Sequence, residues 1–324
     1  MDSGDKSSGQ QYLVVLGQAG MRIDRFLKER FPALSRREIA FWIQQKGVLR
    51  NGRPVRKGAI LCEGDRVDLR IPFGTSRGGV VPQPDLELKV LWEDPLLVAV
   101  DKAPGMPTHP LRTGERGTVA NGLIARYPEM EGIGFSPREP GVLHRLDRET
   151  SGVLLAARQD SAFERLRAEF EQGRVVKVYL AVVHGRPERK GVVARPLGSK
   201  GRRARRVEVH LDEASARGLR GLSPAETQYH VIRYYEGFAF VRLRMTTGAR
   251  HQIRAHMAFL GHPVVGDSVY GEGSRAFPPG RRPGRHLLHA AELGFFHPSE
   301  GRPIRIRAPL PADMRSFLKK LARS

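Results

Sequence analysis

The chain has 324 residues, is 40% hydrophobic and carries a formal net charge of +21. This length allows two domains, of which one can bury a sizeable core. So large a positive charge favours a polyanionic partner, and nucleic acid fits better than a membrane because no basic amphipathic helix stands out. Without an apolar run of about 18 residues, no transmembrane helix is expected. The lone cysteine, Cys62, excludes an internal disulfide and agrees with the cytoplasmic location that we expect.

Residues 12–71 have the pattern of a small helix-turn-helix module that ends in a hairpin sheet. Three apolar residues share the spacing of one helix face and predict a helix over 22–30: Ile23, Phe26 and Leu27. The sequence SRRE at 35–38 predicts a capping box that opens a second helix. Asn51-Gly52 predicts a hairpin turn, and the alternation over 66–71 predicts a strand.

The polar faces of this module carry many basic residues: Arg22, Arg25, Arg36, Arg37, Lys46, Arg50, Arg53, Arg56 and Lys57. A charge run is most often a solvated surface, but so many like charges on a short module favour contact with phosphates. We take five of them as candidate RNA contacts: Arg22, Arg25, Arg36, Arg37 and Lys46. The module also resembles the S-four-like RNA-binding domain in its segments RIDRFL, SRREI, 47–52 and GDRV. Arg50 departs from that family, which usually has an apolar residue there.

Three further segments complete the predicted organisation of the chain. Residues 1–11 are small and polar and predict a disordered tail. Residues 72–86 are rich in Pro and Gly and predict a linker. Residues 87–324 then form a second, larger domain.

Strand patterns dominate this second domain, at Leu96–Val100, Val175–Val183, Gln228–Tyr234 and Phe238–Met245. The sequence SAFE at 161–164 predicts another capping box, with Gly173 beyond the end of its helix. Several strands lie close enough in sequence to pair antiparallel. The patterns therefore predict an α+β fold with a mixed, mostly antiparallel sheet.

The run HRLDRETSG at 144–152 places the Asp147 carboxylate beside arginines in a polar turn that leads into an apolar strand. This run resembles the motif HRLD-x-x-TSG of the RluA-type RNA pseudouridine synthases, and every fixed position is met. Other segments match that family in the same order: 102–110, 177–181, 247–254, 261–271, 288–290 and 308–311. The resemblance covers nearly the whole chain apart from the tail and the linker.

The resemblance implies the pseudouridine synthase fold and an isomerase that converts uridine in RNA to pseudouridine. In this reaction the bond from ribose to the base nitrogen breaks and the base rejoins through a ring carbon, so we expect no cofactor and no metal. By the same resemblance Asp147 is the catalytic carboxylate, and Tyr179 stacks on the uracil and assists proton transfer. Arg254, at the end of HQIR, would keep Asp147 ionised, since a nearby cation lowers a carboxylate pKa.

The target base must leave the RNA stack before it can react. Arg145 is a candidate for the gap that the base leaves, and Lys102 and Arg250 are further candidate RNA contacts. The family has Arg where this chain has Ala249, and Arg250 follows one position later. On a strand such a shift turns the side chain to the other face. The basic loop 200–206 fits solvated charge as well as RNA contact.

Three other functions remain as alternatives. A glycosidase would need a second carboxylate such as Glu149, which we expect to be solvated. A zinc enzyme would use the pairs His251/His256 and His286/His289, but none has the HExxH pattern, which favours structural histidines. The third alternative is an RNA-binding protein that has kept the fold and lost the activity.

The substrate that we predict is large-subunit ribosomal RNA, because relatives that carry the extra domain mostly modify it, with transfer RNA as the alternative. We expect a monomer with no obligate protein partner and no membrane association.

Overall fold

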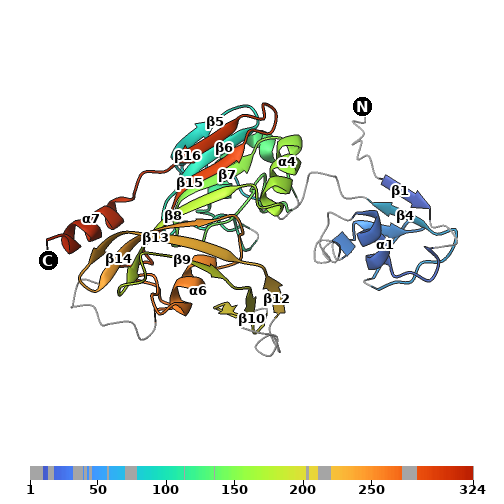
Figure 1. Cartoon of the computed structure of the whole chain (residues 1–324). Coiled ribbons are helices and arrows are strands. Elements are labelled where there is room, and N and C mark those ends of the chain that lie inside the picture. The colour runs from blue at the N-terminus through green and yellow to red at the C-terminus, as the bar shows by residue number, and fades with distance from the viewer. Residues whose placement is uncertain are drawn as a thin grey trace. The chain divides into compact units, whose positions relative to one another are not determined.

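Figure 1 shows a computed structural model of the chain. It describes residues 10–13, 18–31, 39, 42–43, 46–56, 58–69, 79–112, 114–134, 136–201, 204–210, 220–271 and 283–323. Residues up to Gly79 belong to a smaller compact unit, and residues 80–134 and 140–324 form a larger one. None of the helices in these ranges is long and apolar enough to cross a bilayer.

The smaller unit packs helix α1 (Ile23–Arg30) against an antiparallel sheet of order β1-β4-β2-β3. Its strands are β1 (Gln10–Leu13), β2 (Val48–Arg50), β3 (Arg53–Pro54) and β4 (Arg66–Leu69). The helix, the hairpin and the last strand are confirmed, and the turn residues Asn51 and Gly52 both have positive φ, 51° and 79°. The three residues that predicted α1 are buried in the core of this unit.

The structure corrects one prediction for the smaller unit and describes only part of another. The predicted tail is wrong at its end, because Gln10 and Gln11 pair with Leu69 and Asp68 in the sheet. Backbone pairing along a sheet edge thus orders residues that are polar in sequence. Ile39, Trp42 and Ile43 are helical, as the second helix requires. Its predicted capping box at 35–38, with the candidate contacts Arg36 and Arg37, lies outside the described residues.

The predicted linker ends inside the larger unit. The side-chain amide of Asn121 donates to the Val81 carbonyl at 2.7 Å, and the Gly117 N–H donates to the Gln83 side chain at 2.9 Å. These bonds fasten residues 81–83 to helix α3 (Val119–Arg126). The ordered part of the larger unit therefore starts at about residue 80 rather than at 87.

The larger unit is built on one sheet of order β5-β6-β7-β15-β8-β14-β13-β9, with β16 beside β15. Its strands are β5 (Val90–Glu93), β6 (Leu97–Lys102), β7 (Ser151–Ala157), β8 (Val176–His184), β9 (Lys190–Ala194), β13 (Glu226–Tyr235), β14 (Phe238–Met245), β15 (Leu288–Phe296) and β16 (Pro303–Arg307). Only the pair β7–β15 is parallel among these described strands. This confirms the predicted α+β fold with a mixed, mostly antiparallel sheet.

Helices and a second small sheet complete this unit. Helix α4 (Asp160–Glu171) packs on β7, and α6 (Gln252–Phe259) packs on β13. The other elements are η2 (Pro128–Met130), α7 (Ala312–Leu321), and the strands β10 (Leu197–Ser199), β11 (Glu208–Val209) and β12 (Arg220–Ser223). Every residue of β7 is buried, as expected of a strand at the centre of the core.

The capping box predicted at 161–164 is wrong, because the cap of α4 lies two residues earlier than Ser161. Gln159 occupies the cap position without a side-chain bond, and Ser161 already lies inside the helix. Asp160 stands in the first turn instead, where its charge favours the positive end of the helix dipole. Gly173, with φ of 68°, follows the helix as predicted.

Strand register places the HRLDRETSG run and the segment of Tyr179 on either side of β15. Gly152, at the end of the HRLDRETSG run, pairs with Ala290 from one side, and Tyr179 pairs with Ala290 from the other. Two strand spacings, about 10 Å, therefore separate the backbones of Gly152 and Tyr179. Gly152 has φ of 113°, and a Cβ built there would lie 2.1 Å from the Ala290 carbonyl oxygen.

We expect Gly152→Ala to destabilise the protein by about 2–3 kcal/mol, from backbone strain and from the clash with Ala290. Urea unfolding followed by circular dichroism measures this loss. The matched control is Gly132→Ala, because Gly132 also has a positive φ, of 84°, but nothing lies within 4 Å of its Cβ position. Equal losses in the two variants would contradict the close approach of β7 and β15 as the cause.

Candidate active site

The turn that carries Asp147 is fastened to the turn that follows β6. Lys102 donates from its ammonium to three carbonyl oxygens, those of Ala103 at 3.0 Å, Met106 at 2.7 Å and Arg148 at 2.9 Å. On the other side of Asp147, the Thr108 hydroxyl donates to the Leu146 carbonyl at 3.1 Å. The backbone on both sides of the carboxylate is thus held in place by hydrogen bonds.

The structure contradicts Lys102 as an RNA contact. The residue is 1% exposed, and its three ammonium protons are all donated to backbone oxygens. Burial lowers the pKa of Lys102 to about 7, with nearby carboxylates acting in the opposite direction. The sequence could not separate this structural lysine from a surface lysine, because both follow an apolar strand.

Asp147 and Asp267 share the guanidinium of Arg254. Arg254 donates from Nη1 to Asp147 at 2.8 Å, and from Nε and Nη2 to Asp267 at 2.6 and 2.9 Å. The Asp267 side chain is fully buried and also accepts from the N–H groups of Val269 and Tyr270. The bidentate pair with Asp267 therefore fixes the plane of the guanidinium, and the remaining nitrogen, Nη1, donates to Asp147.

The Asp147 carboxylate is ionised and partly open to solvent, with 28% of its side chain exposed. Burial by itself would raise the pKa of Asp147, but the neighbouring His251 and Arg254 lower it below its usual value. His251 Nε2 lies 3.8 Å from Asp147 Oδ1, yet burial lowers the pKa of His251 to about 4. His251 is therefore neutral at pH 7, and Arg254 supplies the positive charge.

Tyr179 lies on β8, where the negative charge of Asp147 contributes to its pKa. It is 6% exposed, and burial raises its pKa well above the usual value, with a further contribution from Asp147. The phenol consequently keeps its proton at neutral pH. The structure thus brings the three predicted catalytic residues, Asp147, Arg254 and Tyr179, to one end of β7, β8 and α6.

The predicted RNA contacts of the larger unit lie around this cluster. Arg145 is exposed, two residues before Asp147. Arg250 is exposed and donates to the Arg205 carbonyl at 3.1 Å, whereas Ala249 is half-buried in a small apolar cluster. The segment 246–251 is a turn rather than a strand, since β14 ends at Met245. The argument that a one-residue shift reverses the face therefore does not apply to Arg250.

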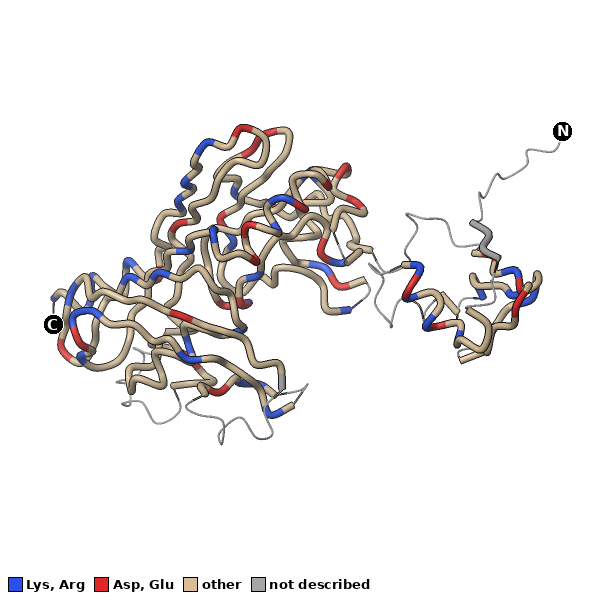
Figure 2. Tube along the Cα trace, turned by 45° about the vertical axis from the view of Figure 1, so that its right-hand side comes forward, with Lys and Arg blue, Asp and Glu red and all other residues tan. Residues whose placement is uncertain are grey.

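In the smaller unit acidic residues lie among the basic residues along the backbone trace, as Figure 2 shows. Arg22 pairs with Asp24 and Arg25 pairs with Glu29, each at 3.0 Å, while the arginine side chains stay 56% and 72% exposed. Lys46 is exposed. Surface ion pairs of this kind are worth about 0–1 kcal/mol, so a phosphate can replace the carboxylate. The positions fit RNA contact but are less uniformly basic than the sequence suggested.

Comparison with known proteins decides the family. The profile of the RNA pseudouridylate synthase family matches residues 96–259, and that of the S4 domain matches residues 21–67. The chain is 38% identical over 317 residues to an RNA pseudouridine synthase of Chloroflexus aurantiacus that is named as uncharacterized, covering 94% of this chain and 91% of that protein. The chain belongs to the RNA pseudouridylate synthase family.

Two further members of the family extend the likeness. The ribosomal large subunit pseudouridine synthase D of Xanthomonas campestris is 34% identical over 324 residues, covering 97% of this chain and 93% of that protein. Among solved structures, human RNA Pseudouridylate Synthase Domain Containing 4 is similar with a TM-score of 0.57 at 26% identity, covering 72% of this chain and 93% of the human chain. This chain is therefore an RNA pseudouridine synthase, an isomerase, with an N-terminal S4 domain.

The histidines that suggested a zinc enzyme have hydrogen-bond partners in this synthase. His256 bonds with Thr227 and the Arg195 carbonyl, and His289 bonds with Ser151 and the Ala308 carbonyl. His286 bonds with Thr150 at 2.8 Å, and His251 with Tyr270 at 3.2 Å. Each fits a structural role. Glu149, the second carboxylate that a glycosidase would need, is 42% exposed beside Arg148.

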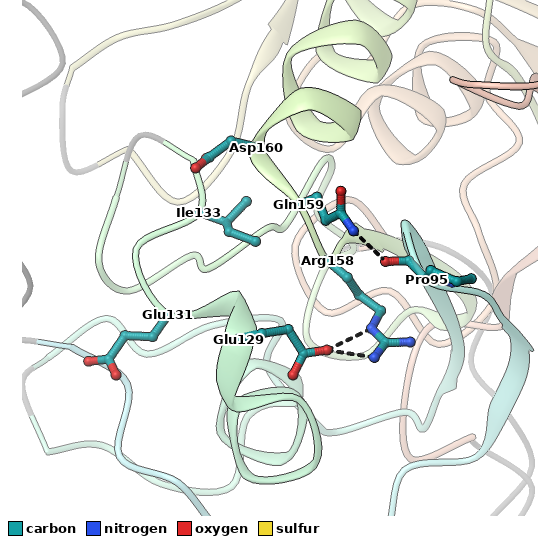
Figure 3. Close-up of a pocket in the computed structure, with 7 residues that line it drawn as sticks. All are labelled: Pro95, Glu129, Glu131, Ile133, Arg158, Gln159 and Asp160. Atoms are coloured by element: carbon teal, nitrogen blue, oxygen red, sulfur yellow. Dashed lines mark hydrogen bonds and ion pairs between the residues drawn. The ribbon is translucent and has the colours of Figure 1, made fainter.

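A hollow elsewhere on the synthase surface contains none of the predicted site residues. Figure 3 shows its lining, which includes Arg158 and the three acidic residues Glu129, Glu131 and Asp160. Arg158 donates to Glu129 from Nε and Nη2, at 2.9 and 2.6 Å. A lining with three acids and one arginine that is already paired disfavours an RNA backbone. This hollow is therefore not the candidate active site.

Sequence reasoning missed two buried residues of the site. Asp267 stands in GDSVY, one glycine after the apolar run Pro263–Val265, and its signals were this position and the resemblance of segment 261–271 to the family. Arg285 donates to the Glu149 carbonyl and to the Ser151 hydroxyl, and pairs with Asp313 of α7 at 2.7 Å. It thereby ties the turn that carries Asp147 to the C-terminal helix α7. No local pattern distinguishes such an arginine among the many in this chain.

Proposed function

We propose that this synthase isomerises uridines of large-subunit ribosomal RNA, with Asp147 as the catalytic carboxylate. The observation that carries the proposal is the 2.8 Å bond from Arg254 to Asp147, which holds an ionised carboxylate at a partly open position. Several relatives, including the Xanthomonas campestris protein, are named ribosomal large subunit pseudouridine synthase D. The S4 domain supplies a second surface for structured RNA.

Each proposed role follows from the local chemistry. Arg254 neutralises one oxygen of Asp147, Oδ2, and leaves Oδ1 to act on the uridine as its glycosidic bond breaks. Tyr179, as a neutral phenol, offers its ring to the detached uracil and an O–H donor rather than a base. Arg145 fills the gap left in the RNA stack. The ring carbon loses a proton as the new bond forms, and the base nitrogen freed from the ribose gains one, so the isomerisation balances without an outside group.

The proposal needs a single chain, since all three residues belong to one protomer, and it places the reaction in the cytoplasm, where ribosomes assemble. RNA contact at Arg22, Arg25, Lys46 and Arg250 is part of the same proposal. These side chains are exposed and basic, and phosphates would take the place of their surface partners.

Mapping of pseudouridine in total RNA from cells without the gene tests the substrate. We expect at least one pseudouridine of large-subunit ribosomal RNA to disappear and to return with the wild-type gene but not with the Asp147→Asn gene. Loss confined to transfer RNA would select the alternative substrate. An unchanged map would favour a protein that binds RNA without modifying it.

A further inference from the structure

Lys177 is a buried lysine on the strand that carries the active-site tyrosine. It stands two residues before Tyr179 on β8, so both side chains lie on the same face of the sheet. The residue is 6% exposed, and its register partners on the adjacent strands are the apolar Met245 and Leu293. Its stem is thus enclosed by the core of the larger unit.

The ammonium of Lys177 lies between the two segments that position Asp147. On one side it sits 5.5 Å from the centre of the Phe170 ring, on which His144 of the catalytic turn stacks at 5.2 Å. On the other side, a Cβ built on Gly248 would lie 3.2 Å from Lys177 Nζ. Gly248 is exposed and belongs to the turn that leads to His251 and Arg254. The buried stem therefore places its ammonium between the Phe170 ring and the exposed turn at Gly248.

Within the described part of the chain, this ammonium has no hydrogen-bond acceptor and no carboxylate partner. Lys102 is similarly buried but donates to three carbonyl oxygens. Burial lowers the pKa of Lys177 to about 8, which leaves it mostly protonated at neutral pH. A largely enclosed cation without a counter-charge costs stability, because the part of its hydration that burial removes is not replaced. Such a group suits an anion that arrives with a ligand.

We propose that the Lys177 ammonium binds a phosphate of the target nucleotide, an inference that rests on the function proposed above. A nucleotide with its sugar at Asp147 and its base on Tyr179 brings its own phosphates to the rim formed by the catalytic turn and Gly248. A phosphate carries its full charge before any bond breaks, so it compensates Lys177 as soon as the RNA binds. A charge on the detached uracil would exist only for part of the reaction.

A chemical double-mutant cycle tests this contact, with the RNA segment that the pseudouridine map identifies. Lys177→Met is combined with RNAs in which the phosphate on one side or the other of the target uridine is replaced by a neutral methylphosphonate. The ribose next to that linkage carries a 2′-O-methyl group in both the modified and the control RNA. We expect Lys177→Met to weaken binding of the unmodified RNA by about 10- to 100-fold. One neutral linkage should weaken wild-type binding similarly and leave the variant unchanged. The single-turnover rate at saturating RNA should stay within about twofold.

If the loss of RNA affinity caused by Lys177→Met and the loss caused by the neutral linkage simply add at both linkages, the proposal is overturned. A fall of the saturated single-turnover rate with unchanged affinity would also overturn it, and would point to the uracil as the partner of Lys177. Isomerisation of the unmodified RNA by the wild-type protein reports separately on the proposed function. If the wild-type protein does not isomerise this RNA, the proposed function is refuted. The double-mutant cycle tests only the contact of Lys177 with a phosphate.

The stability of the free protein separates this role from a structural one. Loss of an uncompensated buried charge should raise the urea midpoint of Lys177→Met above that of the wild type, although the variant binds RNA more weakly. A lower midpoint would contradict the absence of a partner. Two further variants serve if Lys177→Met does not fold. Lys177→Arg keeps the charge and should retain most of the affinity, and Gly248→Ala should weaken binding by displacing the ammonium.

Discussion

Asp147→Asn is expected to lower the rate of isomerisation by about 10³-fold while RNA binding persists. The amide oxygen can still accept from Arg254, and Arg254 keeps its bidentate pair with Asp267, so the geometry of the site should hold. What is lost is the negative charge that acts on the uridine. Single-turnover formation of pseudouridine and a filter-binding assay at fixed salt measure the two effects.

The control for this variant is Glu149→Gln, which removes a carboxylate two residues further along the same turn. Its side chain is 42% exposed, and only its backbone carbonyl contacts Arg285. We expect its rate to stay within about twofold of wild type, since an exposed charge contributes little to the site. Retained activity in Asp147→Asn, or an equal loss in both variants, would refute the assignment of Asp147.

Arg254→Met is expected to destabilise the protein by about 3–5 kcal/mol and to abolish activity. The substitution leaves Asp147 and the fully buried Asp267 without their shared cation. Urea unfolding at pH 7.5 measures the loss. The matched control is Arg167→Met, which breaks an exposed ion pair with Glu171 on α4 and should cost no more than about 0.5 kcal/mol.

The pH dependence of the stability lost in Arg254→Met provides a second test of the role of charge. In the wild type the pKa values of Asp147 and Asp267 are lowered, so their stabilisation is present above the unfolded pKa of about 3.9 and is lost as the pH falls through the folded values. Without Arg254 burial raises both pKa values, and the penalty then grows as the pH rises through them. The difference in stability between variant and wild type should therefore narrow between pH 7.5 and pH 5. A constant difference would show that lost packing, not charge, is responsible.

The sequence anticipated those parts of the site that rest on local patterns or on the family motif. The hairpin at Asn51-Gly52 follows from backbone conformations that these residues favour. The pairing of Arg254 with Asp147, 107 positions apart, was expected only through the resemblance to the family. Alternating patterns likewise indicated strands but not their order, so the parallel pairing of β7 with β15 was not foreseen.

What the sequence could not supply is the burial of individual charges. Lys102 and Lys177 both look like surface residues in the sequence, yet one fastens the catalytic turn and the other lies enclosed beside it. Asp267 lies 13 positions from Arg254, and only the path of the intervening chain makes it a partner. A charged residue is buried when tertiary structure surrounds it, and no short window of sequence records that.

The double pairing of Ala290 bears on how this enzyme can change over evolutionary time. Gly152 and Tyr179 are aligned through the backbone of β15, and the side chain of His289 adds a bond to Ser151. Substitutions at the less buried positions of β15 can therefore accumulate while the spacing between the Asp147 turn and the tyrosine persists. An insertion or deletion of one residue in β15 would instead shift the two halves of the site against each other at once. The strand should consequently vary in composition among descendants but hardly at all in length.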